Sequence, residues 1–94
     1  MAIPFKNTEN WVVGAEMVTT VGGLPFAGVV TVYVTGDGGT QSVGSVGSGL
    51  CDAEGNGYYT YRPAKAETNY TIVAFTFTGP SAAPYTLQVP TIAS

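Results

Sequence analysis

Few residues in this 94-residue sequence could carry out chemistry. The sequence has no histidine, one cysteine (Cys51) and six acidic residues. The lack of histidine excludes Ser–His and Cys–His nucleophile pairs, histidine-ligated metals and histidine acid–base catalysis. A lone thiol without a histidine or cation nearby keeps an ordinary pKa, so we expect Cys51 to be structural. The sequence therefore predicts a protein that is not an enzyme and uses no cofactor or metal.

The densest group of possible ligands is the segment 52–57, with the sequence Asp-Ala-Glu-Gly-Asn-Gly. It superficially resembles a calcium loop, but the twelfth position, where an EF-hand needs a bidentate glutamate, is Pro63. Asp52 and Glu54 could also form a weak exposed cation site or a glycosidase-type carboxylate pair. A β-turn with side-chain-to-backbone hydrogen bonds is the simpler interpretation.

The charge of the chain argues against two classes of partner. The formal net charge is -3, and the three cations Lys6, Arg62 and Lys65 form no basic run. Nucleic acids and anionic membranes are bound by several cations on one face, so we expect neither as a partner. The sequence shows no signal peptide and no membrane-spanning apolar stretch. Together with the single cysteine, this predicts folding in a reducing cytoplasm.

Short runs of β-branched and aromatic residues, separated by glycine and proline, predict strands rather than helices. Residues 29–35 alternate valine with threonine or tyrosine, and residues 70–78 are apolar on both faces, as in a central strand. The glycine-rich segment 41–49 predicts either an edge strand or a mobile loop, and 53–57 a turn. The remaining expected elements are strands at 10–20, 58–62 and 85–89 and a helical turn at 63–67.

About seven short strands in one small chain predict an all-β fold, a single antiparallel β-sandwich with Greek-key connections. A small barrel is the alternative. We expect the sandwich over residues 10–90, with an N-terminal arm at 1–9 and a C-terminal tail at 91–94. The N-terminal segment through Trp11 and the tail after Pro90 are candidate docking arms.

Two stretches resemble a known group of domains. Residues 23–32 (GLPFAGVVTV) resemble the G-x-P-x-x-G-a-x-V-x-V opening of prealbumin-like and carboxypeptidase-regulatory-like Ig-type domains. Residues 50–59 (LCDAEGNGYY) resemble the T-D-x-x-G-x-y hairpin of the same domains, with Cys51 in place of the usual threonine. The resemblance implies an Ig-like sandwich and carries over no catalytic residue.

A third stretch resembles small structural proteins of tailed bacteriophages. Residues 59–70 (YTYRPAKAETNY), followed by 72–79 (IVAFTFTG), are similar to their pattern y-x-x-x-x-T-x-A-E-T-n-y, a strand and t-G. The resemblance implies a non-enzymatic virion protein, either a capsid decoration protein or a neck or tail adaptor. Its partners would be capsid, portal or tail proteins, and it would be assembled into the virion in the host cytoplasm.

Aromatic residues supply the candidate contact sites. Phe5 and Trp11 either close the core or anchor a partner. Tyr33 and Tyr58 are the candidate ligand face of an alternative function, a carbohydrate-binding or adhesin-type Ig-like module. Tyr59, Tyr61 and Tyr70 could extend that face, although strand tyrosines more often pack across strands. The 41–49 edge could pair with a neighbouring copy and give a homo-oligomer.

Overall fold

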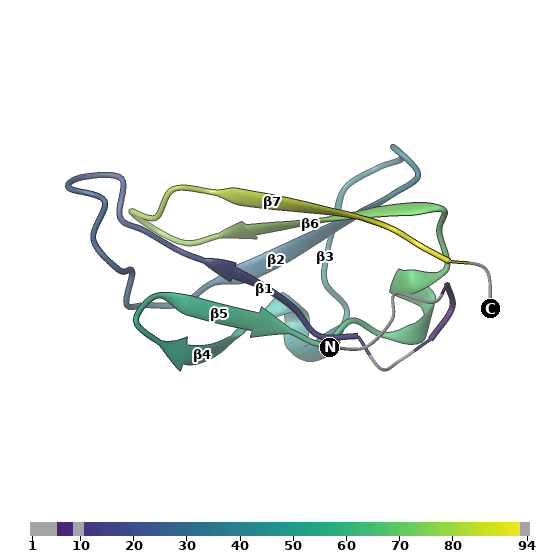
Figure 1. The fold of residues 1–94 in the computed structure, drawn as a ribbon, viewed down its shortest axis with the longest axis horizontal. Coiled ribbons are helices and arrows are strands. Elements are labelled where there is room, and N and C mark those ends of the chain that lie inside the picture. The colour runs from purple at the N-terminus through teal and green to yellow at the C-terminus, as the bar shows by residue number, and fades with distance from the viewer. Residues whose placement is uncertain (1–5, 9–10, 93–94) are drawn as a thin grey trace.

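Two antiparallel β-sheets lie face to face and enclose the core, as Figure 1 shows. This computed structural model describes residues 6–8 and 11–92. The first sheet has three strands and the second has four. In spatial order they are β1 (Val13–Glu16), β5 (Tyr58–Tyr61) and β4 (Asp52–Gly55), then β3 (Ser42–Val43), β2 (Thr31–Gly36), β6 (Ile72–Thr78) and β7 (Tyr85–Pro90).

The strand order is that of an Ig-like sandwich with Greek-key connections, which confirms the predicted fold. The chain changes sheet after β1, β3 and β5, and β2–β3, β4–β5 and β6–β7 are neighbours within a sheet. The orders β1-β5-β4 and β3-β2-β6-β7 correspond to strands B-E-D and C′-C-F-G of Ig domains. No strand among the described residues takes the position of strand A, beside β1.

The core comes from the inward-facing residues of both sheets. On β6, Val73, Phe75 and Phe77 are fully buried, and the β2 valines that register with the two phenylalanines are buried too. The predicted central position of residues 70–78 is confirmed, because β6 lies between β2 and β7. The other large buried side chains are Trp11, Met17, Phe26, Tyr59 and Tyr61.

The first strand is shorter than the predicted run of 10–20. After Met17 the chain turns into a hairpin-like loop, in which Thr19 N–H donates to the Leu24 carbonyl at 2.8 Å. Gly22 and Gly23 at the tip have φ of 86° and 61°, which only glycine adopts without strain. The loop protrudes at the left end of the molecule in Figure 1.

The turn predicted at 53–57 is confined to its last two residues, because 52–55 form the strand β4. β4 pairs with β5, and the reversal is confined to Asn56 and Gly57, whose φ values are 54° and 84°. Two successive positive φ values define a type I′ hairpin turn, for which Asn-Gly is a favoured pair. The register shifts between Ala53 and Gly55. The hairpin implied by the Ig-type resemblance is therefore present.

The glycine-rich segment 41–49 divides into two structures. It forms the two-residue edge strand β3 and then the 3-10 turn η1 (Val46–Gly49). Gly44 and Gly49 are buried, and no side chain would fit at either position. A Cβ at Gly44 would lie 2.7 Å from the Tyr61 hydroxyl, and one at Gly49 would lie 2.9 Å from the Val32 carbonyl. These glycines allow the backbone to pack closely against the core. The helical turn predicted at 63–67 is the 3-10 turn η2 (Lys65–Thr68).

The described parts of both termini are bonded to the sandwich. Lys6 N–H donates to the Ile92 carbonyl at 2.8 Å, and Asn7 N–H to the Thr68 carbonyl at 3.0 Å. At the other terminus, Thr91 N–H donates to the Thr71 carbonyl at 2.9 Å. Residues 6–8 and 91–92 are thus not free docking arms, which corrects that part of the expectation. Apart from Trp11, the rest of the predicted arms lies outside the described residues.

We expect Gly57→Ala to destabilise the protein by about 3 kcal/mol or more, because a Cβ there adds strain at positive φ and a backbone clash. That Cβ would lie 2.6 Å from the Met17 carbonyl oxygen. The matched control is Gly23→Ala, with φ of 61° and no atom within 4 Å of the added Cβ. It should cost only about 1 kcal/mol. Urea unfolding of both variants measures the difference, and equal losses would contradict the clash.

Candidate functional site

Groups that usually carry catalysis are sparse in the described part of the chain. No three Asp, Glu, Cys or His residues there lie together as a metal site. The helices found in that part are too short and too polar to cross a membrane. Burial, with a smaller contribution from the Asp52 charge, raises the pKa of the Cys51 thiol to about 11. This corrects the expected ordinary pKa and makes the thiol a poorer nucleophile at neutral pH.

Three carboxylates hold the backbone or neighbouring strands in place. Asp37 Oδ1 accepts hydrogen bonds from the Thr71 and Ile72 N–H groups at 2.9 and 3.0 Å, where β6 begins. Glu54 Oε2 accepts from the Thr60 hydroxyl at 2.8 Å, across the β4–β5 pair. The third is Glu67, described next. Asp52 and Glu54 therefore lie on an edge strand rather than in a metal-binding loop.

Glu67 joins three parts of the chain. Its Oε1 accepts from the Tyr61 hydroxyl at 2.6 Å and from Ala64 N–H at 2.9 Å, and its Oε2 accepts from Ser45 N–H at 2.9 Å. The Tyr61 hydroxyl in turn accepts from Val46 N–H at 3.2 Å. Burial, together with the hydrogen bond to Glu67, raises the Tyr61 pKa to about 12. The network fixes η2 and the segment before η1 to the core.

Tyr59 fixes a second loop in the same way. Its ring is 3% exposed, and its hydroxyl accepts from Gly28 N–H at 3.0 Å and donates to the Phe26 carbonyl at 3.2 Å. Tyr59 and Tyr61 therefore point into the sandwich. This corrects the interpretation in which they extend an exposed ligand face.

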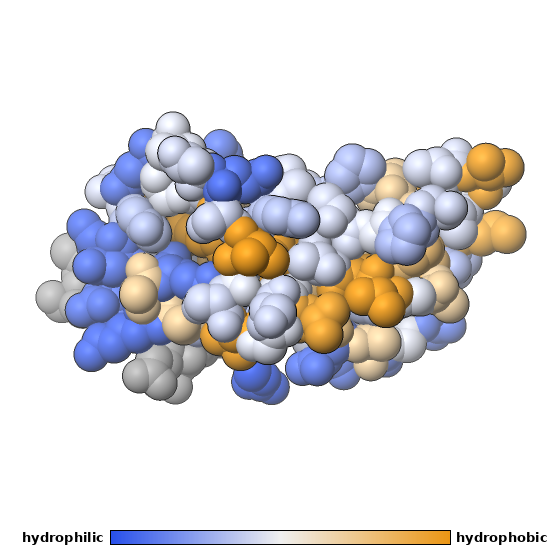
Figure 2. All heavy atoms as spheres, turned by 180° about the vertical axis from the view of Figure 1, so that it is seen from behind, coloured by the Kyte–Doolittle hydropathy of each residue, from blue (hydrophilic) through white to orange (hydrophobic). Residues whose placement is uncertain are grey.

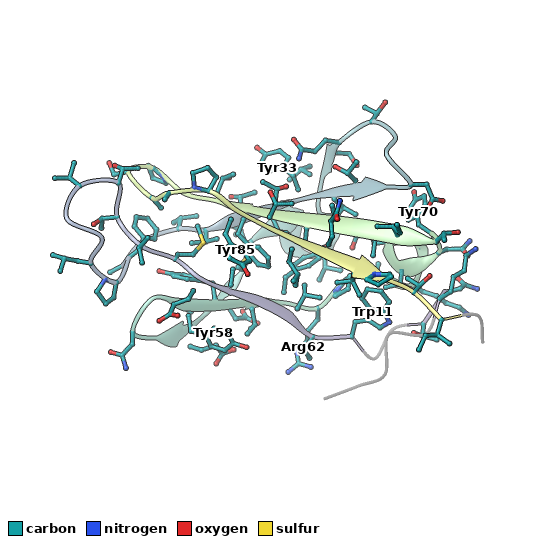
Figure 3. The ribbon with its side chains drawn as sticks, turned by 45° about the horizontal axis from the view of Figure 1, so that its top comes forward. Trp11, Tyr33, Tyr58, Arg62, Tyr70 and Tyr85 are labelled. Carbon is teal, nitrogen blue, oxygen red and sulfur yellow. The ribbon has the colours of Figure 1, made fainter. Side chains whose placement is uncertain are left out.

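Tyr33 and Tyr58 lie on opposite sides of the molecule, as Figure 3 shows. Tyr33 is on β2 of the four-stranded sheet, and Tyr58 is on β5 of the three-stranded sheet. Val32 and Val34 face the core, so Tyr33 faces outward, and Tyr58 leans over Gly14 on the outer surface of the other sheet. A single ligand face containing both tyrosines is therefore wrong, because the whole sandwich separates them.

Trp11 is part of the core. The side chain is 3% exposed, its ring meets Phe75 edge-on with centroids 6.2 Å apart, and Nε1 donates to the Thr8 hydroxyl at 3.1 Å. This placement agrees with the interpretation in which Trp11 closes the core and corrects the one in which it anchors a partner. Phe5 lies outside the described residues.

The strand residues that face outward from the four-stranded sheet are uncharged, and we call the surface they form the uncharged face. Asp37, which follows β2, lies at one end of it beside Ile72, where its carboxylate accepts from the Thr71 and Ile72 N–H groups. It combines apolar residues with threonines, and the hydroxyls of Thr76 and Thr86 lie 3.1 Å apart across β6 and β7. Val29 and Leu50 are 62% and 57% exposed. Strand pairing and alternation place on it Val29, Thr31, Tyr33, Thr35, Val43, Leu50, Ile72, Ala74, Thr76, Thr78, Thr86 and Gln88.

Sequence reasoning missed this surface, although its signal is in the sequence. The outward positions of three strands are filled by threonine, tyrosine, glutamine and small apolar residues, without an acid or a base. Figure 2 shows the molecule from behind, with apolar side chains grouped over its middle and at one end, and hydrophilic ones at the other end. Exposed apolar groups that lie together mark interaction surfaces rather than chance exposure.

Charged residues gather on the opposite sheet. Glu16, Asp52, Glu54 and Arg62 are all exposed on or next to β1, β4 and β5. The two sheets thus present chemically different surfaces.

A hollow of about 210 Å³ opens beside β3, where Val43, Glu67 and Tyr70 contribute to its lining. Glu67 already accepts three hydrogen bonds there, so its carboxylate is held in place by the fold.

No known protein family, curated protein or solved structure matches this chain.

We expect Glu67→Ala to lower the free energy of unfolding by about 2 kcal/mol, because it leaves the Tyr61 hydroxyl and two N–H groups without their acceptor. Lys65→Ala, in the same turn and exposed, is the control and should change stability by no more than about 0.5 kcal/mol. Urea denaturation measures both. A Glu67→Ala variant as stable as Lys65→Ala would show that the network contributes nothing.

Alkaline pH should destabilise the protein through Tyr61. The pKa of this phenol rises from 10.0 to about 12 in the folded state, so folding favours its protonated form. The resulting stabilisation is fully present below pH 10 and is lost as the pH rises toward 12. Denaturant midpoints at a series of alkaline pH values check this. In Tyr61→Phe the midpoint should fall less steeply over the same range, and an identical slope would contradict the assignment.

Proposed function

We propose that this protein is a non-enzymatic structural component of a tailed-bacteriophage virion that acts through protein–protein contact. In this proposal the sandwich decorates the capsid or serves as an adaptor at the neck or tail. The uncharged face is the surface that docks on the neighbouring virion protein.

The uncharged face is the observation that carries the proposal. Interface cores are depleted of charged residues, because an ion buried without a partner loses its hydration. The twelve residues of this face contain no acid or base, and Val29, Val43, Leu50 and Ile72 are 44–62% exposed. Burial of such side chains is favourable, and the threonine hydroxyls can keep hydrogen bonds at the contact.

The sheet makes this face a firm platform. β2 pairs with β6 over six residues and β6 pairs with β7 over six, so the backbone beneath the face is held by continuous ladders. The core valines and phenylalanines support it from below. A preordered surface loses little conformational entropy on docking, which suits permanent incorporation into a particle.

The assignment to a virion rests on the resemblance of residues 59–79. Within that segment Glu67 and Thr68 have structural roles: Glu67 binds Tyr61 and Ser45, while the Thr68 hydroxyl donates toward the Thr8 carbonyl at 2.8 Å. In this structure, these two residues of the motif hold the turn η2 against β5, Ser45 and Thr8 at one end of the sandwich. Absence of histidine and the structural engagement of Asp37, Glu54 and Glu67 support a role without catalysis.

The test of the proposed function is to count copies of the chain in purified particles by quantitative mass spectrometry, relative to the major coat protein. Roughly hundreds of copies per particle would identify a decoration protein, and roughly six to twelve a neck or tail ring. Absence from particles would overturn the proposal and favour a binding module of another kind.

A charge placed within the uncharged face should block docking. We expect Thr35→Lys to reduce incorporation into particles by about tenfold or more, because the contact would remove water from the lysine ammonium group. Ala53→Lys, on β4 of the other sheet, is the control and should be incorporated normally. Thermal melting of both variants checks that they fold. Normal incorporation of folded Thr35→Lys would show that docking does not use the uncharged face.

A further inference from the structure

The structure points to one strand edge that is open to pairing. Four strands end the two sheets: β3, β7, β4 and β1. β3 has only two residues, β7 ends in Pro90, which has no N–H, and β4 is interrupted by a register shift and carries Asp52 and Glu54. Short length, proline, irregularity and charge are the usual ways to prevent edge pairing. β1 carries the charge of Glu16, and just past it residues 81–83 bond to Val18 and Thr20, so the open part of this edge runs from Val12 to Glu16.

The peptide groups of β1 that point away from β5 can be identified from the register. Glu16 pairs with Tyr58, and one step further Met17 N–H donates to the Gly57 carbonyl at 2.7 Å. Odd-numbered residues of β1 therefore bond to β5, and even-numbered ones point outward. The outward peptide groups belong to Val12, Gly14 and Glu16, which we call the β1 edge. No described residue pairs with it.

We propose that the β1 edge pairs with the β1 edge of a second copy, in antiparallel register about a two-fold axis. Gly14 then lies opposite the partner's Gly14, and Val12 lies opposite the partner's Glu16. The two three-stranded sheets become one continuous six-stranded sheet. This inference does not depend on the proposed virion role, because it uses the other sheet.

Charge complementarity selects this occupant and register. The side chains of Val12, Glu16 and Arg62 face outward on the same surface, and Arg62 lies opposite Val12 when the β1–β5 register is continued by one residue. In the pair, Arg62, Val12 and the partner's Glu16 lie in one row across three strands. The Arg62 and Glu16 Cα atoms are then about 10 Å apart, two strand spacings, and their long side chains can meet over Val12.

The symmetry of the pair doubles this contact. The same row recurs on the other side of the axis, so one interface contains two Arg62–Glu16 pairs. Within a single copy, neither side chain has an ion-pair partner among the described residues. Figure 3 shows Arg62 projecting away from the body on the side of the three-stranded sheet. The two Glu16 residues are kept apart, since each lies opposite a valine rather than the other glutamate.

Glycine at the centre allows close approach. Gly14 has no side chain, and the ring of Tyr58 lies over it, where a Cβ would come within 2.8 Å of Tyr58 Cε1. At the two-fold axis the two Gly14 backbones can pair without side chains between them, flanked by the two Tyr58 rings. The uncharged faces of both copies remain free, so the dimer would present two of them.

The experiment is sedimentation equilibrium of the full chain and three charge variants. The wild-type chain should form a dimer, and Glu16→Arg and Arg62→Glu should each raise its dissociation constant about tenfold or more, because each creates like-charge rows. The double variant E16R/R62E should restore the dimer. Asp52→Arg, on the far edge of the same sheet, is the control and should dimerise as the wild type does.

Hydrogen exchange of individual amides identifies the edge itself. The N–H groups of Gly14 and Glu16 should be protected in the wild-type dimer and lose that protection in Glu16→Arg, while those of Val13 and Ala15, bonded to β5, remain protected. A wild-type chain that is monomeric at its highest soluble concentration overturns the proposal. A dimer that survives both single reversals, or that is not restored in the double variant, also overturns it.

Discussion

Two core tyrosines, Tyr59 and Tyr61, connect the interior of this sandwich to its loops. Both rings are buried, and both hydroxyls leave the core to bind backbone: Tyr59 at Phe26 and Gly28, Tyr61 at Val46. Tyr61 also donates to Glu67, which holds the Ser45 N–H. A buried phenol must satisfy its hydroxyl, so each ring can occupy the core only when its loop is in place. Packing and loop conformation are thereby coupled through one strand, β5.

This coupling explains why a chain with so little charge and no disulfide can keep long irregular segments ordered. The loop before β2 and the segment around η1 make few regular ladder bonds, yet each is tied to a tyrosine that the core already holds. Glycine completes the arrangement, since Gly44 and Gly49 bring backbone to within contact of Tyr61 and Val32, where a side chain would not fit. Glycine usually weakens a strand, but at these two positions it lets the backbone pack closely against the core.

The two outer surfaces have different physical characters, and each of the two proposals rests on one of them. The four-stranded sheet carries threonines and exposed apolar residues on continuous ladders, a surface that loses little when it is desolvated. The three-stranded sheet carries Glu16, Asp52, Glu54 and Arg62 around an open strand edge. The proposed docking uses the first surface, and the proposed pairing with a second copy uses the edge of the second.

Most of the strands and the sandwich could be predicted from the sequence, because they depend on local alternation and on which residue types are present. The sequence predicted the central position of residues 70–78 and the helical turn near Glu67 from short-range pattern. It did not determine that Trp11, Tyr59 and Tyr61 lie in the core, that Tyr33 and Tyr58 face opposite ways, or that segment 52–55 is a strand. Those outcomes depend on which strands pair and which sheet each joins, and pairing between residues far apart in the chain is decided only when the whole core packs.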